Sequence, residues 1–285
     1  MSDPFKINGP TCISFSGGRT SAYMLWRVLK SYGGPGMLPT DTVVCFANTG
    51  KEEEATLRFV HECGDAWGVP IMWVEYRNDE HGYAVVDFDS ASRNGEPFEA
   101  IIRKRNYLPN PLTRFCTVEL KILAMERALV ARGFDEWENF VGIRADEERR
   151  AAKILANPSG GRRRVMRSMP LVSAGVTAGD VGAFWDEQAF NLQLPTYNGR
   201  TLAGNCDLCF LKGGQQVMSL IAERPERAVF WARMESTIAS AGRFKGDGAR
   251  FRNDRPSYSQ MAQFAADQSD WIGYDESIED CACTD

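Results

Sequence analysis

Short apolar runs alternate with amphipathic stretches over the first quarter of the chain. Cys12 to Phe15, Thr42 to Ala47 and Pro70 to Val74 are apolar and bounded by turn residues, which is typical of buried strands. Between them, Ala22 to Leu29 and Glu52 to Trp67 place apolar residues at helical spacing. This strand–helix order predicts right-handed crossovers and a parallel sheet with helices on both faces.

The rest of the chain predicts a further helix and strand, and then a region without strands. Arg77 to Pro111 is irregular and polar, which indicates loops or an inserted lid. Apolar spacing predicts a helix over Thr117 to Arg132 and a strand over Trp137 to Ile143. Beyond residue 170 we expect a loop and helices, over Val172–Leu192, Gln215–Glu223, Glu226–Ser240 and Tyr258–Ala266. The predicted fold is therefore a doubly wound α/β domain over residues 1–170 and a mainly helical and irregular C-terminal region over 171–285.

The turn after the first predicted strand has the composition of an anion site. Ser16-Gly17-Gly18-Arg19-Thr20-Ser21 offers a glycine pair, hydroxyl donors and the free amides of a helix start. The alternative is an ordinary strand-to-helix turn with a serine N-cap. Asn48-Thr49-Gly50 follows the next strand, and carboxyl ends of parallel strands meet at one sheet edge. The two segments can therefore form one site.

Composition limits the classes of protein. The chain has 285 residues, with 44% hydrophobic and 25% charged, which is ordinary for a globular protein. It has no apolar run near the roughly 20 residues of a membrane span, and the N-terminus does not resemble a signal peptide, so we expect a cytoplasmic location. The net charge of -5 argues against indiscriminate nucleic-acid binding. Arg144 to Arg167 is nevertheless basic, and such a run is either a solvated face or a surface for an anionic substrate, with Arg149, Arg150, Arg162, Arg163 and Arg164 as candidate substrate-binding residues.

The eight cysteines divide into two groups. Cys12, Cys45 and Cys63 lie in apolar patterns, so we expect them in the core. Cys206-Asp207-Leu208-Cys209 lies between glycines, a spacing at which two thiolates can bind one metal or cluster. Cys116, just before a helix, adds a third candidate ligand, and either Cys281 or Cys283 adds a fourth. The spacing alone leaves three alternatives open. The cysteines could bind an iron–sulfur cluster, they could form a four-thiolate zinc site, or they could bind no metal, in which case the cysteine pair could form a redox disulfide.

These motifs together resemble the phosphoadenosine phosphosulfate (PAPS) reductase family, a branch of the PP-loop, adenine-nucleotide alpha-hydrolase-like proteins. Ser16–Ser21 is similar to the PP-loop, SGGxDS, with Thr20 at the usual aspartate. Asn48-Thr49-Gly50 is similar to the family's DTG segment, Cys116–Lys121 to a helix start with a cysteine and a lysine, and Gly142–Glu147 to an arginine motif that faces the nucleotide's anionic end. The resemblance extends from about Thr11 to Gly214.

The resemblance implies roles for these residues. Lys121 and Arg144 would be catalytic, and the nucleotide would contact Ser14, Ser16, Gly17, Gly18, Arg19, Thr20, Ser21, Asn48, Thr49 and Gly50. Relatives with a 4Fe–4S cluster carry an adjacent cysteine pair and then a CxxC, and here Thr117 replaces the second cysteine. Cys116, Cys206 and Cys209, with Cys283 or Cys281, would then ligate a 4Fe–4S cluster, with zinc as the alternative.

Three functions remain open. The first is an ATP-dependent enzyme that uses Mg²⁺, adenylates an oxygen and supports sulfur transfer to an anionic or nucleic-acid substrate, with a cysteine-desulfurase-like sulfur donor. The second is a sulfonucleotide reductase that releases sulfite, with a thioredoxin-like electron donor and Cys281 or Cys283 as nucleophile. The third is a non-catalytic nucleotide-binding or metal-stabilised interaction protein. The intact glycine pair favours the first, because the tail, Glu279–Asp285, lacks the Glu-Cys-Gly context of the reductases.

Overall fold

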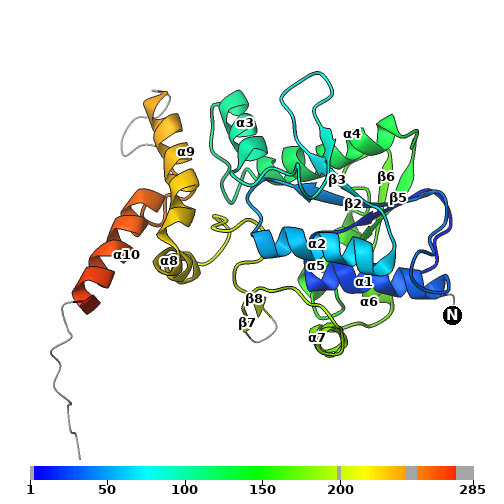
Figure 1. The fold of residues 1–285 in the computed structure, drawn as a ribbon. Helices are drawn as coiled ribbons and strands as arrows, with labels where there is room; N and C mark the ends of the chain where they lie inside the picture. The colour runs from blue at the N-terminus through cyan, green and yellow to red at the C-terminus, as the bar shows by residue number, and fades with distance from the viewer. Residues whose placement is uncertain (1–2, 198–199, 242–248, 274–285) are drawn as a thin grey trace, which may run out of the picture. The chain divides into compact units, whose positions relative to one another are not determined.

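A six-stranded sheet organises the N-terminal part of the protein. The computed structural model describes residues 3–197, 200–241 and 249–273 (Figure 1). The strand order is β4-β3-β2-β1-β5-β6, and neighbours are parallel except for the antiparallel pair β3 and β4. The strands are β1 (Thr11–Ser14), β2 (Thr42–Asn48), β3 (Ile71–Glu75), β4 (Ala84–Val86), β5 (Trp137–Val141) and β6 (Val165–Ser168).

Helices cover both faces of this sheet. Figure 1 shows α1 (Arg19–Ser31) and α2 (Glu54–Trp67) on one side and α4 (Ala124–Ala131) on the other. On the α4 side, Ala128 and Leu129 pack with Cys12, Cys45 and Trp137 in one apolar cluster. The doubly wound α/β fold expected from the sequence is therefore confirmed, and Cys12, Cys45 and Cys63 are buried as expected.

The structure differs from the predicted elements in three places. The helix expected over Thr117 to Arg132 begins as a π-helix, η1 (Thr117–Leu123), before it continues as α4. The region interpreted as a lid contains β4 and α3 (Glu96–Arg105), and the basic stretch contains α5 (Glu148–Ala156) and β6. These elements were missed because β4 and β6 are short, and because α5 buries only Ala151 and so lacks an apolar stripe.

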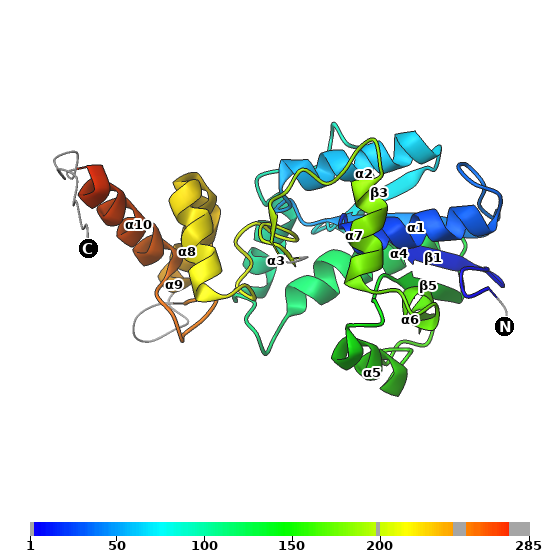
Figure 2. The same ribbon diagram turned by 90° about the horizontal axis from the view of Figure 1, so that it is seen from below.

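Two helices complete this part of the fold. They are α6 (Pro170–Ser173) and α7 (Ala178–Asp186), the second of which begins at a capping box formed by Thr177 and Asp180. Phe184 on α7 lies against Tyr23 and Trp26 of α1, so α7 packs against α1 and runs across it (Figure 2). A small antiparallel pair, β7 (Thr196–Tyr197) and β8 (Arg200–Thr201), follows.

The chain forms two compact units. The first comprises Met1–Ile101 and Phe115–Asp207, and the second comprises Ile102–Arg114 and Leu208–Asp285. These limits differ from the division at residue 170 expected from the sequence. The boundary at residue 170 was predicted as the end of a nucleotide-binding domain, and the extent of that domain stays a prediction. Among the described residues, no helix combines the length and the apolar character needed to cross a membrane.

The second unit is helical, as expected for the C-terminal region. It contains α8 (Gly214–Glu223), the short 3₁₀ helix η2 (Pro225–Arg227), α9 (Ala228–Ser240) and α10 (Tyr258–Gly273). Trp231, Phe251 and Tyr258 form an aromatic core. The Glu235 carboxylate accepts hydrogen bonds from the Phe251 and Tyr258 amides, and its burial raises the pKa of Glu235.

Candidate functional site

The turn after β1 is a tight loop closed by two serine side chains. Oγ of Ser21 accepts a hydrogen bond from the Ser16 amide at 3.1 Å and donates one to the Gly18 carbonyl at 2.9 Å. The two serine hydroxyls lie 3.0 Å apart. Gly17 has φ +76°, and a Cβ there would lie 2.6 Å from Cγ2 of Thr56 on α2. Only glycine therefore fits this position without strain or a clash.

The start of α1 is not closed by a side chain. Gly18 is the N-cap, and no side chain caps the helix there. The serine N-cap of the ordinary-turn interpretation is therefore not what the structure shows. Because the first amides of a helix carry partial positive charge, this 13-residue helix provides an electropositive end next to the loop.

The end of β5 meets the same helix start. A Cβ at Gly142 would lie 3.1 Å from Cα of Ser21, so β5 and α1 approach closely there. Two residues later, Nη1 of Arg144 donates to Oγ1 of Thr20 at 3.2 Å, and its Nε donates to Asp146 at 2.9 Å. In the sheet, β2 and β5 lie on opposite sides of β1, so the order in which the strands are added reverses at β1. Ligands of open α/β sheets bind at such a switch point.

The segment after β2 is held by a buried carboxylate. Nδ2 of Asn48 donates to Oε1 of Glu75 at 2.7 Å, and Oδ1 of Asn48 accepts from the Gly50 amide at 3.0 Å. Glu75 is fully buried, accepts hydrogen bonds from the amide and hydroxyl of Ser92, and forms an ion pair with Arg77. An amide is needed at residue 48, because an aspartate would place a second carboxylate against Glu75. This explains why the asparagine stands where related motifs have aspartate.

A second buried carboxylate organises the next residues. Oε2 of Glu52 accepts from the amide of Thr49 at 2.9 Å and from its hydroxyl at 2.8 Å. Oε1 of Glu52 pairs with Nζ of Lys121 at 3.4 Å, which brings the π-helix to this segment. The Thr49 hydroxyl also lies 3.4 Å from Sγ of Cys206. Lys121, predicted to be catalytic, therefore lies beside the segment that follows β2.

The segment that contains Cys206 is connected to the segment after β2 by backbone hydrogen bonds and by an ion pair. Cys206 forms an antiparallel bridge with Glu52, and the Asp207 amide donates to the Lys51 carbonyl at 2.7 Å. Nζ of Lys51 pairs with Oδ2 of Asp207 at 3.0 Å, and both side chains are at most 10% exposed. This ion pair could not be predicted from the sequence, because the two residues are far apart in the chain.

Comparison with known proteins shows the family of the chain. Residues 10–190 match the family model of the phosphoadenosine phosphosulfate reductase domain. The chain belongs to this PAPS reductase family. It is 31% identical over 215 residues to the nin region protein ORF290 of Escherichia phage lambda, covering 72% of this chain and 67% of that protein.

A solved structure shares a weak likeness with the chain. It is described as the U34-tRNA thiolase NcsA from Methanococcus maripaludis with its 4Fe–4S cluster. The identity is 14%, the TM-score is 0.41, and the similarity covers 99% of this chain and 80% of the other. At these values the likeness supports no conclusion about the function of this family member.

The structure places the predicted arginines in different surroundings. Arg19 donates from Nε to Asn191 at 2.7 Å, and its guanidinium also contacts the Leu192 carbonyl, so it lies against the segment after α7. Three of the five predicted substrate-binding arginines have a carboxylate partner: Arg150 pairs with Glu147, Arg162 with Glu126 and Arg164 with Asp135. Four of the five are exposed, and Arg162 is half-buried. Their binding roles stay predictions.

The predicted metal ligands are only partly described. Cys116 and Cys206 lie in the first unit, Cys209 lies in the second, and Cys281 and Cys283 lie outside the described residues. Across the described part of the chain, no three or more His, Cys, Asp or Glu side chains are arranged to hold a metal ion. The four-cysteine site stays a prediction, and no reaction step is derived from it.

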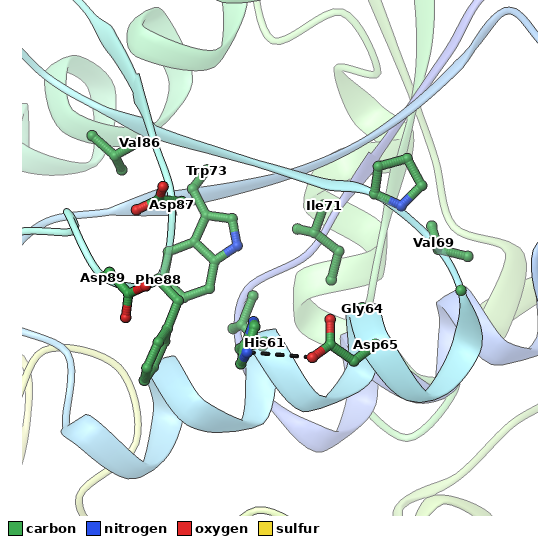
Figure 3. Close-up of a pocket in the computed structure, with 13 residues that line it drawn as sticks. His61, Gly64, Asp65, Val69, Ile71, Trp73, Val86, Asp87, Phe88 and Asp89 are labelled. Carbon is green, nitrogen blue, oxygen red and sulfur yellow. Dashed lines mark ion pairs between the residues drawn. The ribbon is translucent and has the colours of Figure 1, made fainter.

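A separate pocket lies at the β3–β4 edge of the sheet. It has a volume of about 640 Å³, and His61 is one of the residues that line it. Figure 3 shows His61 stacked beside Phe88, with Nε2 of His61 paired with Asp65 at 3.3 Å. Trp73 also lines this pocket. None of the predicted site residues lines it, so it is distinct from the strand-end loops.

Proposed function

We propose that this PAPS reductase family member binds ATP at the carboxyl ends of β1, β2 and β5 and transfers its adenylyl group to an acceptor oxygen. The observation that carries this proposal is the uncapped start of α1 behind the Gly17 turn. The phosphates of a nucleotide can accept hydrogen bonds from backbone amides at the positive end of a helix dipole. Arg144 is fixed at the same helix start by Thr20 and adds a full positive charge.

The chemistry follows from these positions. The acceptor oxygen attacks the α-phosphorus, the bond from that phosphorus to the bridging oxygen breaks, and pyrophosphate leaves with the electron pair. Backbone amides of the loop and Arg144 stabilise the charge that develops on the phosphates. Mg²⁺, when bound, would neutralise pyrophosphate. A persulfide of a donor protein then attacks the carbon that bears the adenylated oxygen and displaces AMP. A second thiol of the donor attacks the inner sulfur of this adduct, which leaves the donor as a disulfide and the acceptor thiolated.

The buried carboxylates support the proposal through charge balance. Glu52 and Glu75 lie close to the segment after β2, and each has a cationic partner, Lys121 and Arg77 respectively. Without these cations, two carboxylates at this edge would repel a triphosphate. Lys121 thus acts as a positioning residue for Glu52 and Thr49, in addition to the catalytic role expected from the sequence.

Calorimetric titration of the full chain with ATP and Mg²⁺ tests the binding step. We expect saturable binding that Arg144→Met weakens by at least about tenfold, because a charge-assisted contact to phosphate is lost. Arg132→Met, on the exposed end of α4, is the matched control and should bind as the unmodified chain does. The absence of ATP binding to the unmodified chain would overturn the proposal, and release of pyrophosphate on addition of an acceptor would extend it.

Family membership favours a second candidate, the thiol-dependent reduction of a sulfonucleotide. A thiolate would attack the sulfur of the sulfonate, the nucleotide phosphate would leave, and a second thiol would release sulfite. The test is sulfite release from PAPS with reduced thioredoxin. It should be lost when Cys281 and Cys283 are both replaced by serine. Sulfite release that survives this double substitution contradicts a tail nucleophile.

A further inference from the structure

Helices α8 and α10 lie side by side in the second unit (Figure 2). Side chains of both helices and of the segment 250–256, which precedes α10, line a cavity of about 680 Å³. We call it the α8–α10 cavity. Its volume lies in the range of small-molecule sites. None of the residues that line it belongs to the loops after β1, β2 or β5, so it is separate from the proposed ATP site.

The two helices give the cavity an apolar wall that is incompletely covered. Met218 of α8 and Met261 of α10 contribute flexible thioether side chains, which pack well against aromatic rings. Phe264, three residues after Met261 on α10, is 54% exposed. A ligand with an aromatic body would remove this apolar area from water.

The segment before α10 adds two guanidinium groups. Nη1 of Arg255 donates to the Lys212 carbonyl at 3.1 Å, and its Nη2 donates to the Tyr258 hydroxyl at 2.8 Å, so its position is fixed. Arg250 differs from it, because its Nε is buried and its guanidinium has neither a hydrogen bond nor a close ion pair with any described residue. A buried donor without an acceptor is unfavourable. Arg250 is therefore the group that an acceptor within the cavity would satisfy.

The charges around the cavity favour a ligand with a single negative charge. Burial raises the pKa of Glu235, and the guanidinium groups of Arg250 and Arg255 act to lower it, so this carboxylate lies near both. It balances only one of the two cations. The start of α8 at Gly214, where no side chain caps the helix, adds partial positive charge to the same cavity.

We infer that the α8–α10 cavity binds a small amphipathic carboxylate, with an aromatic body and a single negative charge. The planar fork of Arg250 matches a carboxylate, to which a guanidinium can donate two parallel hydrogen bonds. The aromatic body would lie against Met218, Met261 and Phe264. A phosphate monoester fits less well, because it carries more negative charge at neutral pH than this arrangement balances. The inference does not rest on the proposed ATP-dependent function.

Calorimetric titration of the full chain, without ATP, tests the cavity with matched compounds. The probe is 4-phenylbutyrate, while 4-phenyl-1-butanol has the same body without the charge, and butyrate has the charge without the ring. We expect saturable binding of the probe and at least about tenfold weaker binding of each of the other two. Equal binding of the alcohol would show that the charge is not recognised, and equal binding of butyrate would show the same for the ring. Either result overturns the inference.

Substitutions then assign the binding to the cavity. Arg250→Gln should reduce the affinity for 4-phenylbutyrate to that for the alcohol. Phe264→Ala, at an exposed position, should weaken the probe severalfold and leave butyrate unchanged. Arg252→Gln is the matched control, since it removes the same charge from the same segment. Arg252 does not line the cavity, and it donates from Nε to Asp254 at 2.7 Å.

The acidic residues 274–285 are the rival occupant of the cavity, because they follow α10 in the sequence and include no lysine or arginine. Replacement of the carboxylates at 275, 276, 279 and 280 by their amides should leave probe binding unchanged. Binding that becomes about tenfold tighter would mean that this segment competes for the cavity, and the inference would then fail. It also fails if 4-phenylbutyrate does not bind the unmodified chain, or if Arg250→Gln weakens it no more than Arg252→Gln does.

Discussion

The loops after β1 and β2 lie at one edge of the sheet but hold their shapes by different means. The loop after β1 is closed by the hydroxyls of Ser16 and Ser21 and by the left-handed backbone of Gly17. The segment after β2 is held by the buried carboxylates of Glu52 and Glu75. The first loop contains no carboxylate, and an electropositive helix end lies behind it. The second contains negative charges that nearby cations balance.

This difference indicates a division of work between the two loops. A loop built from hydroxyls and glycine leaves its backbone amides for an anion. A segment built around buried carboxylates is rigid, because each carboxylate oxygen fixes particular donors, but it must be shielded from that anion. The following predictions separate these two contributions, and they run from the largest expected effect to the smallest.

Replacement of Glu75 should have the largest effect on stability. Glu75→Ala leaves the Asn48 amide and the Ser92 donors buried without acceptors, and it should lower the free energy of unfolding by about 3–5 kcal/mol. Urea denaturation measures this change. Glu62→Ala, at an exposed position on α2, is the control and should cost less than about 0.5 kcal/mol. A loss below about 1 kcal/mol for Glu75→Ala would contradict a rigid β2 segment.

The Lys51–Asp207 pair tests how firmly the cysteine segment is attached. Lys51→Met leaves the Asp207 carboxylate buried without its cation and should cost about 3 kcal/mol. The double substitution, with Asp207→Leu, should recover most of this loss, so a double-mutant cycle should give a coupling of about 2 kcal/mol. Additive losses in the two single variants would mean that the pair does not join these segments.

Gly17→Ala should damage the β1 loop in both shape and binding. The added methyl group requires an unfavourable φ and meets Thr56, so we expect a loss of about 1–3 kcal/mol in stability. ATP binding, measured by calorimetry, should weaken by at least about tenfold. Gly18→Ala is the stability control, because its backbone has φ -108° and a Cβ there lies 3.7 Å from the nearest heavy atom. Equal losses of stability in the two variants would contradict a specific requirement for glycine at residue 17.

Thr20→Val should have the smallest effect. It removes the hydroxyl that receives Nη1 of Arg144, which is worth about 0.5–1.5 kcal/mol. ATP affinity should fall severalfold, because the guanidinium is less well placed. Thr20→Ser keeps the hydroxyl and should restore the affinity. If valine and serine behave alike, Arg144 does not depend on residue 20 for its position.

The sequence predicted the elements with strong local patterns and missed those fixed by distant partners. β1, β2, β3 and the two helices between them were predicted because their apolar spacing is clear. Glu75 could not be found in this way, because it pairs with a residue 27 positions away. Asn139, whose Oδ1 accepts a hydrogen bond from the Ser14 hydroxyl at 2.9 Å, is 125 positions from Ser14. One feature of the sequence did mark Asn139. It is a polar residue in a predicted strand, on the face that it shares with Trp137 and Val141.

The π-helix at Thr117–Leu123 makes the site sensitive to chain length as well as to residue type. A π-turn holds about one residue more than an α-turn, so deletion of a single residue there would let α4 extend backwards as an ordinary helix. Residues before the deletion would rotate by about 100° relative to those after it. The side chain of Lys121 could then no longer reach Glu52 while Leu129 keeps its place in the core. A one-residue deletion could thus disconnect the site and leave the scaffold intact.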